Sequence, residues 1–481
     1  MTSPKKILLV GAECAPFAKT GGLADVIGTL PAQLKKLGAD ARVMMPLHRQ
    51  IKEKYRYELY HICTFYVTLG WRTQFCGIET LTVNGIQYYF VDNEYYFGGP
   101  IYKGGEAEGE QYAFFSRAVL EALPLIDFMP DVIHANDWHT AMIPMLIKTQ
   151  YSGDVGRIST LFTIHNIAYQ GRFSPFFVKD LLGVPDSFIT PQYMEAYGDA
   201  NFLKAGIVFS DKVNTVSPSY AQELKYPYYS EGMDGVLNSR GGDFCGIING
   251  IDTISFDPHT DKNIKNHYTS GSLYNKKQDK LALIEELSLN ADEYTPVISM
   301  VTRLTEQKGI DLVMYALSGI MAQDICLVVL GSGDKKYEDF FFSAQAKYPG
   351  KIAYSNKYDE ALSHRIYAGS DLFLMPSKFE PCGISQMIAM RYGTLPIVRE
   401  TGGLKDTVKP YNEFEQSGTG FSFANYNADE MLGVIKLALS VYRDEKRFRG
   451  IQKQAMAEDF SFETSAKKYL ELYKSCIERR L

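Results

Sequence analysis

A chain of 481 residues exceeds what one hydrophobic core usually supports, so its length predicts two domains. Hydrophobic residues make up 46% of the chain and charged residues 22%, which is typical of a globular protein and excludes a disordered one. The net charge of −6 argues against nucleic acid as a main partner, because a phosphate backbone is bound by clustered lysine and arginine.

The cysteines and the apolar runs indicate where the protein resides. Seven cysteines are scattered without a C-x-x-C pair, which favours a reducing compartment over disulfides or structural zinc, and we expect a cytoplasmic protein. The run ILLV at residues 7–10 is too short for the core of a signal peptide. No stretch approaches the roughly 20 apolar residues of a membrane helix, so we expect no membrane partner.

Short apolar runs alternate with polar turns and amphipathic helices, as in parallel βαβ units. In the first half these runs are KILLV, DVIHA, LFTIHN and KVNTVS, beginning at residues 6, 131, 161 and 212. In the second half they are VISMVTRL, CLVVLGSGD, LFLMPS and LPIVRE, beginning at residues 297, 326, 372 and 395. Two α/β halves are therefore predicted.

Two helices stand out by their periodicity. The first is expected to begin at Gly22 and end at Gly38, with Pro31 kinking it, and its apolar face holds Leu23, Ile27, Leu30, Leu34 and Leu37. The second is marked near the C-terminus by Ala466, Leu470, Tyr473 and Ile477, but periodicity alone does not place it. A polar stretch at residues 257–294 indicates a boundary, so we expect domains at 1–250 and 251–460, followed by a helix at 461–481.

One motif occurs twice: KTGGLADV at residues 19–26 and ETGGLKDTV at residues 400–408. A Gly-Gly pair between a strand and a helix lets a ligand approach the backbone, and the helix N-terminus suits an anion. Two open sheets that each bind beyond their strand ends could line one cleft from both sides. Alternatively, each copy is only a tight turn with close helix packing. VLGSGD at residues 329–334 lacks the full G-x-G-x-x-G pattern, which counts against a nicotinamide enzyme.

The sequence as a whole resembles the bacterial glycogen synthases and plant starch synthases. Besides the repeated motif, the resemblance rests on NDWHT, FTIHNIAYQG, IINGID, TRLTEQKGIDLV and PSKFEPCGISQMIAMRYGTLPIVRE, in matching order along nearly the whole chain. It implies a GT-B architecture, an α/β fold of two Rossmann-like domains facing across a deep interdomain cleft, with the C-terminal helix crossing back to the first domain.

The resemblance also implies an activity. It is that of a retaining glucosyltransferase, which moves glucose from a nucleotide sugar, usually ADP-glucose, to the non-reducing end of an α-1,4-glucan such as glycogen or starch. No cofactor and no metal are implied, and His134 and His139 lack the spacing of a metal-binding helix. The choice between ADP-glucose and UDP-glucose, the oligomeric state and any effectors stay open.

Several residues match the family's donor site. Arg303 and Lys308 match its diphosphate-binding pair, which stabilises the leaving group with fixed positive charge, and Lys19 matches a lysine that reaches the donor from the first domain. Solvated side chains on loops are the alternative. The resemblance adds Gly21, Gly22, Gly402 and Gly403 of the repeated motif as backbone contributors, and Thr401 as a further substrate-binding residue.

Glu380 matches the family's essential carboxylate, which can hold sugar hydroxyls and favour positive charge on the sugar ring. Cys382 is expected to line the sugar pocket rather than act as a nucleophile, and the N–H groups of Gly383 and Ile384 to meet a phosphate. Many retaining GT-B enzymes carry a second glutamate eight residues later, where this chain has Ile388. A front-face substitution, in which the leaving phosphate helps to deprotonate the acceptor, is therefore the better hypothesis.

Four more residues complete the expected site. His165 matches the family's active-site histidine, expected to donate a hydrogen bond to a sugar hydroxyl, and Asp137 matches an acceptor-side aspartate, with a helix N-cap as the alternative. Tyr358 is expected near the nucleotide base and Tyr102 near the sugar, unless both only pack. Rival functions are another GT-B glycosyltransferase with a different sugar nucleotide or acceptor, and an inactive glucan-binding scaffold.

Overall fold

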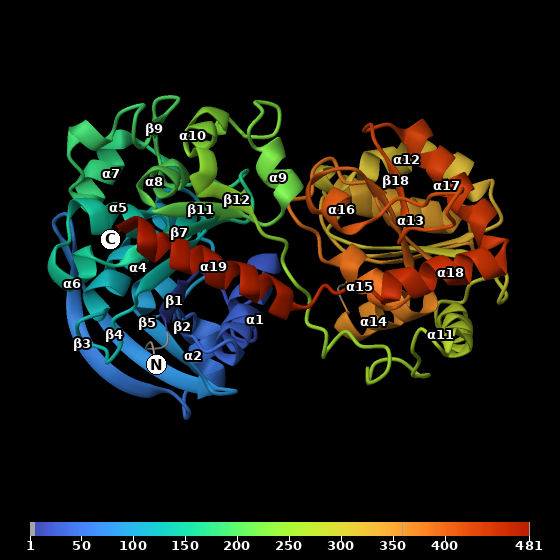
Figure 1. Ribbon diagram of the computed structural model, residues 1–481, viewed down its shortest axis with the longest axis horizontal. Helices are drawn as coiled ribbons and strands as arrows, with labels where there is room; N and C mark the ends of the chain where they lie inside the picture. The colour runs from blue at the N-terminus through green and yellow to red at the C-terminus, as the bar shows by residue number, and fades with distance from the viewer. Residues whose placement is uncertain (1–4, 358, 481) are drawn as a thin grey trace. The chain divides into compact units, whose positions relative to one another are not determined.

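The computed structural model describes residues 5–357 and 359–480, so the predicted site residue Tyr358 lies outside the described residues. The chain divides into two compact units. The first holds the described residues up to Val216, Ala221–Ile247 and the C-terminal residues from Phe462, and the second holds Ser217–Tyr220 and Ile248–Ser461. Each unit is an α/β structure with a central sheet (Figure 1).

Within its described residues, the first unit has a nine-stranded sheet with the order β12-β11-β7-β6-β1-β2-β5-β4-β3. The strands are β1 (Lys6–Val10), β2 (Asp40–Pro46), β3 (Tyr60–Leu69), β4 (Arg72–Val83), β5 (Ile86–Asp92), β6 (Val132–Asn136), β7 (Ser159–Ile164), β11 (Lys212–Thr215) and β12 (Phe244–Gly246). Only β4 and β3 are antiparallel to their neighbours. The strand order reverses between β1 and β6, and ligands bind at such a switch point in open α/β sheets.

The helices of this unit cover the sheet, and a small second sheet stands beside it. The helices include α1 (Gly22–Lys36), α2 (Arg49–Tyr55), α4 (Gly105–Ala122), α5 (Met142–Thr149), α7 (Pro175–Leu182), α8 (Phe202–Phe209), α10 (Asp234–Ser239) and α19 (Phe462–Arg480). The small sheet has the order β8-β10-β9, formed by β8 (Arg172–Phe173), β10 (Asp199–Asn201) and β9 (Glu195–Ala196). This sheet borders two pockets that are described below.

Among the residues that the structure describes, the second unit has a six-stranded parallel sheet with the order β15-β14-β13-β16-β17-β18. Its strands are β13 (Val297–Val301), β14 (Cys326–Leu330), β15 (Ile352–Ser355), β16 (Leu372–Met375), β17 (Leu395–Arg399) and β18 (Phe421–Phe423). Its helices include α11 (Leu273–Glu286), α12 (Ile310–Met321), α13 (Lys335–Lys347), α14 (Glu360–Gly369), α15 (Ser385–Arg391), α16 (Gly402–Thr407), α17 (Ala428–Tyr442) and α18 (Glu445–Met456). Numbered along the chain, this is the 3-2-1-4-5-6 order of dinucleotide-binding folds, with the switch point between β13 and β16.

The predicted strands and helices are confirmed, while the kink at Pro31 stays a prediction. All eight apolar runs form strands, and α1 continues through Pro31 to Lys36 with Leu23, Ile27, Leu30 and Leu34 buried. The polar stretch at residues 257–294, which was expected only as a boundary, contains α11. Its buried Lys280 pairs with Asp371 at 2.8 Å, so this helix uses polar side chains to pack.

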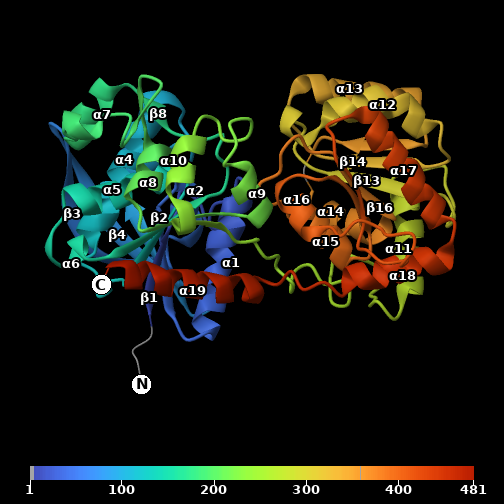
Figure 2. The ribbon, with the colours of Figure 1, turned by 45° about the horizontal axis from the view of Figure 1, so that its top comes forward.

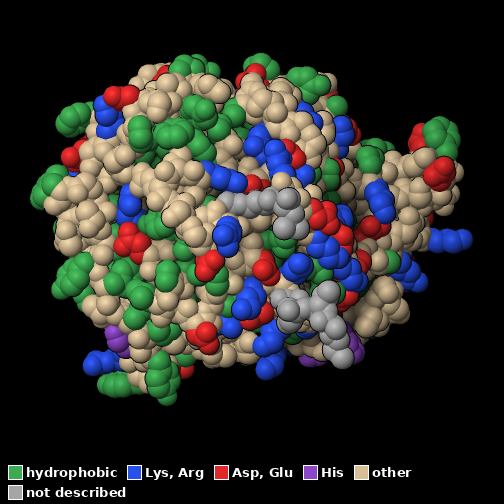
Figure 3. All heavy atoms as spheres, turned by 60° about the vertical axis from the view of Figure 1, so that its left-hand side comes forward, with side chains coloured by type: hydrophobic (Ala, Val, Ile, Leu, Met, Phe, Trp, Pro, Cys, Tyr) green, Lys and Arg blue, Asp and Glu red, His purple; other side chains and the backbone are tan. Residues whose placement is uncertain are grey.

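The C-terminal helix α19 packs against α1, β6 and β7 of the first unit (Figures 1 and 2). Its buried face includes Ala466, Tyr469, Tyr473 and Cys476, and the Tyr473 hydroxyl lies 2.9 Å from Nδ1 of the buried His134. None of the described helices is long and apolar enough to cross a membrane. On the face seen in Figure 3, positive and negative side chains are interspersed, without a large patch of one sign.

Candidate active site

The predicted residues of the first unit follow strands at or beside its switch point. The glycine loop follows β1, Asp137 directly follows β6, and His165 directly follows β7. Because parallel strands end at one edge of the sheet, residues from three distant parts of the sequence meet there.

The first glycine loop is held by Glu13, a residue that the sequence analysis missed. Glu13 is 2% exposed, and its Oε2 accepts the N–H of Thr20 at 2.5 Å. Burial raises the pKa of this carboxyl. A carboxylate of the chain itself therefore lies where α1 begins, the kind of position at which an anion is favoured. Glu13 is the only acidic residue between β1 and the glycines, and that signal could have identified it.

Lys19 and Gly22 face solvent or open space. The side chain of Lys19 is 53% exposed, and its Nζ lies 2.7 Å from Oδ1 of Asp25. Gly21 precedes α1 in an extended conformation. A Cβ added to Gly22 would meet no atom within 4 Å, so packing within the chain does not require glycine there.

Asp137 organises the ends of β6 and β7. It adopts a positive φ of 55°, and its Oδ1 accepts the N–H of His165 at 2.7 Å. Asp137 occupies the N-cap position of the short helix Trp138–Thr140, but its carboxylate makes no cap hydrogen bond to that helix. Burial raises the pKa of Asp137 to about 7, which gives a carboxyl that titrates near neutral pH.

The tautomer of His165 follows from its neighbour Asn136. The amide nitrogen of Asn136 donates to the carbonyl oxygens of Val10 and His134, at 3.1 and 3.0 Å, so its Oδ1 faces Nε2 of His165, at 2.9 Å. Nε2 therefore carries the proton. Burial lowers the pKa of His165 to about 3, so the ring is neutral and Nδ1 is an acceptor. The expected role as a donor to a sugar hydroxyl does not fit this tautomer, in which Nδ1 accepts.

Tyr102 joins this group from a distant part of the sequence. Its side chain lies beside Thr20 of the glycine loop, and its ring centroid is 5.0 Å from that of His139. His139 contacts Glu108 at 3.5 Å, whereas His134 is bonded to Tyr473. In the described part of the chain, no group of three or more His, Cys, Asp or Glu side chains is arranged to hold a metal ion.

In the second unit, Glu380 and Lys308 form a mostly buried ion pair. Nζ of Lys308 lies 2.6 Å from Oε2 of Glu380, and the two side chains are 15% and 7% exposed. The hydroxyl of Ser377 donates to the same oxygen at 3.0 Å. Arg303 follows β13 and is exposed, and within the described residues its side chain makes no hydrogen bond or ion pair. The second unit thus places the paired Lys308 and the unpaired Arg303 after β13, and the carboxylate of Glu380 after β16.

The second copy of the glycine motif packs against the Glu380 loop. The N–H of Gly403 donates to the carbonyl oxygen of Glu380 at 3.1 Å. A Cβ on Gly402 would lie 2.0 Å from that oxygen, and one on Gly403 would lie 2.0 Å from the carbonyl oxygen of Cys382. The buried Thr401 precedes α16. Close packing, the alternative interpretation, therefore explains both glycines of this copy, and their contact with a ligand stays a prediction.

The residues after Glu380 have distinct environments. Cys382 is 5% exposed and burial raises its pKa to about 12, so it is a thiol and a poor nucleophile. Gly383 has a φ of 71°, and Ile384 immediately precedes α15. Their N–H groups donate no hydrogen bond within the described residues. Ile388 is 3% exposed, in a place where a carboxylate would lose its hydration.

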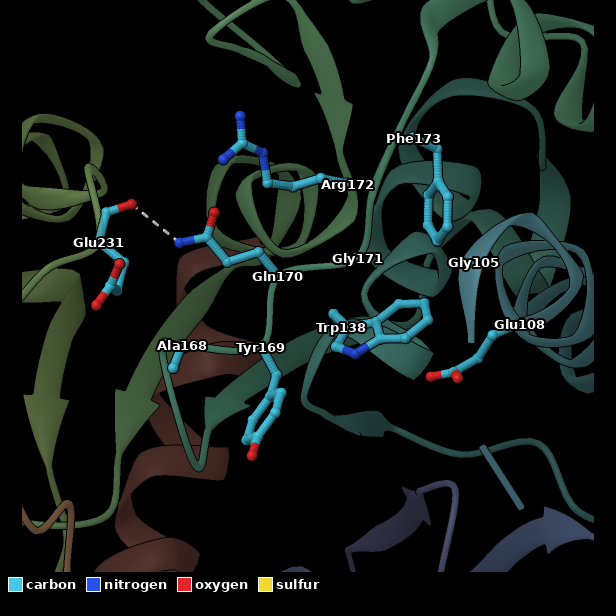
Figure 4. A pocket seen from close by; sticks show the side chains of 10 residues that line it. All are labelled: Gly105, Glu108, Trp138, Ala168, Tyr169, Gln170, Gly171, Arg172, Phe173 and Glu231. Atoms are coloured by element: carbon cyan, nitrogen blue, oxygen red, sulfur yellow. Dashed lines mark hydrogen bonds between the residues drawn. The ribbon is translucent and has the colours of Figure 1, made fainter. Parts of the chain in front are cut away.

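A pocket of about 380 Å³ in the first unit is lined by Trp138, the residue that follows Asp137 (Figure 4). Its lining combines rings, amides and charges: Gly105, Glu108, Trp138, Ala168, Tyr169, Gln170, Gly171, Arg172, Phe173 and Glu231. Gln170 donates to the backbone oxygen of Glu231 at 3.0 Å, and the Tyr169 side chain is 54% exposed. We call it the Trp138 pocket.

Comparisons with known proteins identify the family. A family model described as "Starch synthase catalytic domain" matches residues 6–239, and one described as "Glycosyl transferases group 1" matches residues 285–454. A glycogen synthase of Lachnospira eligens is 48% identical over 98% of this chain and 100% of its own length. For a glycogen synthase of Geobacillus thermodenitrificans the identity is 47%, over 98% of each chain.

The chain belongs to the glycogen synthase and starch synthase family. The structure is also similar to the catalytic domain of Arabidopsis thaliana starch synthase IV bound to ADP and acarbose, with a TM-score of 0.91 and 32% identity over 99% of this chain and 100% of that one. Sucrose-phosphate synthase of Thermosynechococcus elongatus shares the fold, with a TM-score of 0.64 and 18% identity over 98% of each chain.

This glycogen synthase family member is therefore a glycosyltransferase with the GT-B fold and two Rossmann-like domains, as its motifs predict. Its function is that of a glycogen synthase. The two named relatives support this function and neither of the rival functions. A nucleotide sugar and a glucan acceptor are its substrates in general terms.

Proposed function

We propose that the protein transfers glucose from ADP-glucose to the non-reducing 4-hydroxyl of an α-1,4-glucan with retention of configuration, without a metal, in the cytoplasm. The observation that carries this proposal is the mostly buried Lys308–Glu380 pair at the switch point of the second unit, beside a loop that also carries the unpaired Arg303. Cations at this edge suit a diphosphate leaving group, and the neighbouring carboxylate suits the sugar.

Each charged group has a role in this proposal. Arg303 binds the diphosphate with its planar guanidinium, and Lys308 neutralises the developing charge while it orients Glu380 at 2.6 Å. Glu380 stabilises positive charge on the sugar ring as the glycosidic bond breaks. Since position 388 holds a buried isoleucine, no second carboxylate on α15 supports a covalent intermediate, and we propose a front-face substitution.

The first unit supplies the acceptor side. The end of the glucan enters the Trp138 pocket, next to Asp137, whose pKa of about 7 lets it accept a hydrogen bond from the attacking hydroxyl in its ionised form. Nδ1 of the neutral His165 accepts a hydrogen bond from a sugar hydroxyl. The similar starch synthase IV domain is bound to ADP and acarbose, which supports an adenine nucleotide and an oligosaccharide as ligands of this chain.

The proposal is tested by following labelled glucose from ADP-glucose and, separately, from UDP-glucose into glycogen, with and without a chelator. We expect transfer from ADP-glucose into amylase-digestible polymer at a rate that the chelator leaves unaltered. Preference for UDP-glucose would contradict the donor assignment, and loss of activity restored by a divalent ion would contradict the metal-free scheme. The anomeric configuration of the product, measured by nuclear magnetic resonance, tests retention.

A further inference from the structure

A further pocket, of about 440 Å³, lies in the first unit between β9, α8 and α10. Its lining includes Gln192, Glu195, Tyr197, Lys204, Gly232 and Ser239. We call it the Tyr197 pocket, because the ring of Tyr197 is 74% exposed at this site. Figure 1 shows β9, α8 and α10 grouped together in this unit.

The Tyr197 pocket and the Trp138 pocket share a wall. Glu231 lines the Trp138 pocket and the next residue, Gly232, lines the Tyr197 pocket. A Cβ on Gly232 would lie 2.5 Å from the Tyr197 hydroxyl, so the side chain of Tyr197 packs directly against the backbone of Gly232. Two adjacent residues of one loop thus face the two pockets.

The small sheet connects the pockets a second time. Arg172 on β8 lines the Trp138 pocket, and its guanidinium carbon lies 5.7 Å from the ring centroid of Tyr197, while the group pairs with Asp199 of β10 at 3.2 Å. Figure 4 shows this guanidinium beyond Gln170, directed away from Trp138. Since β8 and β9 flank β10, the pockets border opposite edges of the sheet, about 10 Å apart.

The polar groups of the Tyr197 pocket favour a neutral ligand. Nζ of Lys204 donates to the backbone oxygens of Pro191 and Glu195, at 2.6 and 2.7 Å, and Oε1 of Glu195 accepts the N–H of Gly198 at 2.6 Å. Both charged side chains are thereby bound to the backbone of the pocket itself. The exposed ring of Tyr197 and the amide of Gln192 remain to meet a ligand, whereas the hydroxyl of Ser239 donates to the carbonyl oxygen of Val236 at 2.7 Å and can only accept a hydrogen bond from one. Such a surface suits the apolar face and hydroxyl groups of a sugar.

We propose that the Tyr197 pocket binds a distal segment of the α-glucan acceptor, a few glucose units from the end that reacts beside Asp137. This inference rests on the proposed function, because it takes the Trp138 pocket as the place of the acceptor's end. A long acceptor fills both pockets, whereas a short one fills only the Trp138 pocket. The second contact is then intramolecular, so the affinity for long chains rises without any change in the reacting site.

The test compares KM for maltoheptaose with KM for maltotriose, using saturating donor. In Tyr197→Ala the ratio of the two constants is expected to rise about three- to tenfold, because the variant removes one ring contact from the longer acceptor. Ser239→Trp, which adds bulk at an exposed position of the pocket, is expected to raise the ratio as well. Tyr226→Ala is the matched control, since Tyr226 is 64% exposed but lines neither pocket.

An unchanged ratio in both pocket variants, with unfolding midpoints equal to that of the parent, would overturn the inference. An equal rise for both acceptors would also overturn it, because the pocket would then not be distal. Calorimetric binding of maltoheptaose to the parent protein and to Tyr197→Ala separates this inference from the proposed function. Absence of transfer to any acceptor, together with weaker binding of maltoheptaose by Tyr197→Ala, would refute the proposed catalysis but still support glucan binding in the Tyr197 pocket.

Discussion

The two copies of the glycine motif provide a matched pair of substitutions, Gly403→Ala and Gly22→Ala. The added methyl group of Gly403→Ala would lie 2.0 Å from the carbonyl oxygen of Cys382, so α16 or the Glu380 loop must move. Such overpacking costs about 1–3 kcal/mol, and loss of the hydrogen bond from the Gly403 N–H adds about 1 kcal/mol. The same change at Gly22 meets no atom within 4 Å.

We therefore expect Gly403→Ala to destabilise the second unit by about 2–4 kcal/mol, which corresponds to a Tm lowered by roughly 5–15 °C for a domain of this size. Gly22→Ala is expected to leave the Tm unchanged or slightly raised, because alanine favours a helix over glycine. Scanning calorimetry measures both, since it resolves the transitions of a two-domain protein. Equal shifts in the two variants, or none in Gly403→Ala, would refute the assignment of close packing to the second copy alone.

Three further predictions concern the charged groups. Glu380→Gln is expected to lower kcat about 100-fold or more, measured by glucose transfer, while circular dichroism stays unchanged. Arg303→Ala should weaken ADP binding about tenfold or more in calorimetry, because charged hydrogen bonds are lost, whereas Arg157→Ala, at an 82% exposed side chain, should not. The pKa of Asp137 is raised from 3.8 to about 7, so the native state binds the extra proton and stability falls as pH rises through this range. Between pH 4 and pH 7 the unfolding free energy of the first unit should therefore fall in the parent protein by up to about 4 kcal/mol on account of Asp137. This part of the fall should be absent in Asp137→Asn, measured by denaturant titration at each pH.

The sequence predicted the strand ends because parallel strands alternate with helices in a regular pattern. Asp137 and His165 follow apolar runs that form adjacent strands, so their proximity follows from the strand order alone. The antiparallel strands β3 and β4 were not predicted. Polar residues on the exposed face of β3 interrupt the apolar pattern by which a strand is recognised. In addition, β3 is the edge strand of the sheet and pairs only with β4.

Other features depended on neighbours that are distant in sequence. The tautomer of His165 depends on the orientation of the Asn136 amide, which is set in turn by the carbonyl oxygen of Val10. No local pattern contains that information. Likewise, Glu13 reaches Thr20 only because the loop after β1 folds back on itself, and irregular loops have no periodicity to read.

The two glycine motifs share the residues Thr-Gly-Gly-Leu but differ in their structural surroundings. In the first copy the loop is held by a carboxylate, and Gly22 stays open toward its surroundings. In the second copy the glycines allow α16 to approach the backbone at Glu380. One local sequence can therefore stay open in one unit and pack closely in the other, because glycine permits both.

The packing of the second copy bears directly on the catalytic role proposed for Glu380. Glu380 is fixed by groups that follow three neighbouring strands: Lys308 beyond β13, Ser377 beyond β16 and the N–H of Gly403 beyond β17. The first two hold its carboxylate and the third holds its backbone. A displaced catalytic group can cost orders of magnitude in rate, so Gly403→Ala should lower kcat far more than its loss of stability alone would explain. If Glu380 has the catalytic role proposed above, the second glycine motif influences the reaction by fixing the backbone of Glu380, even though the N–H of Gly403 is engaged within the chain.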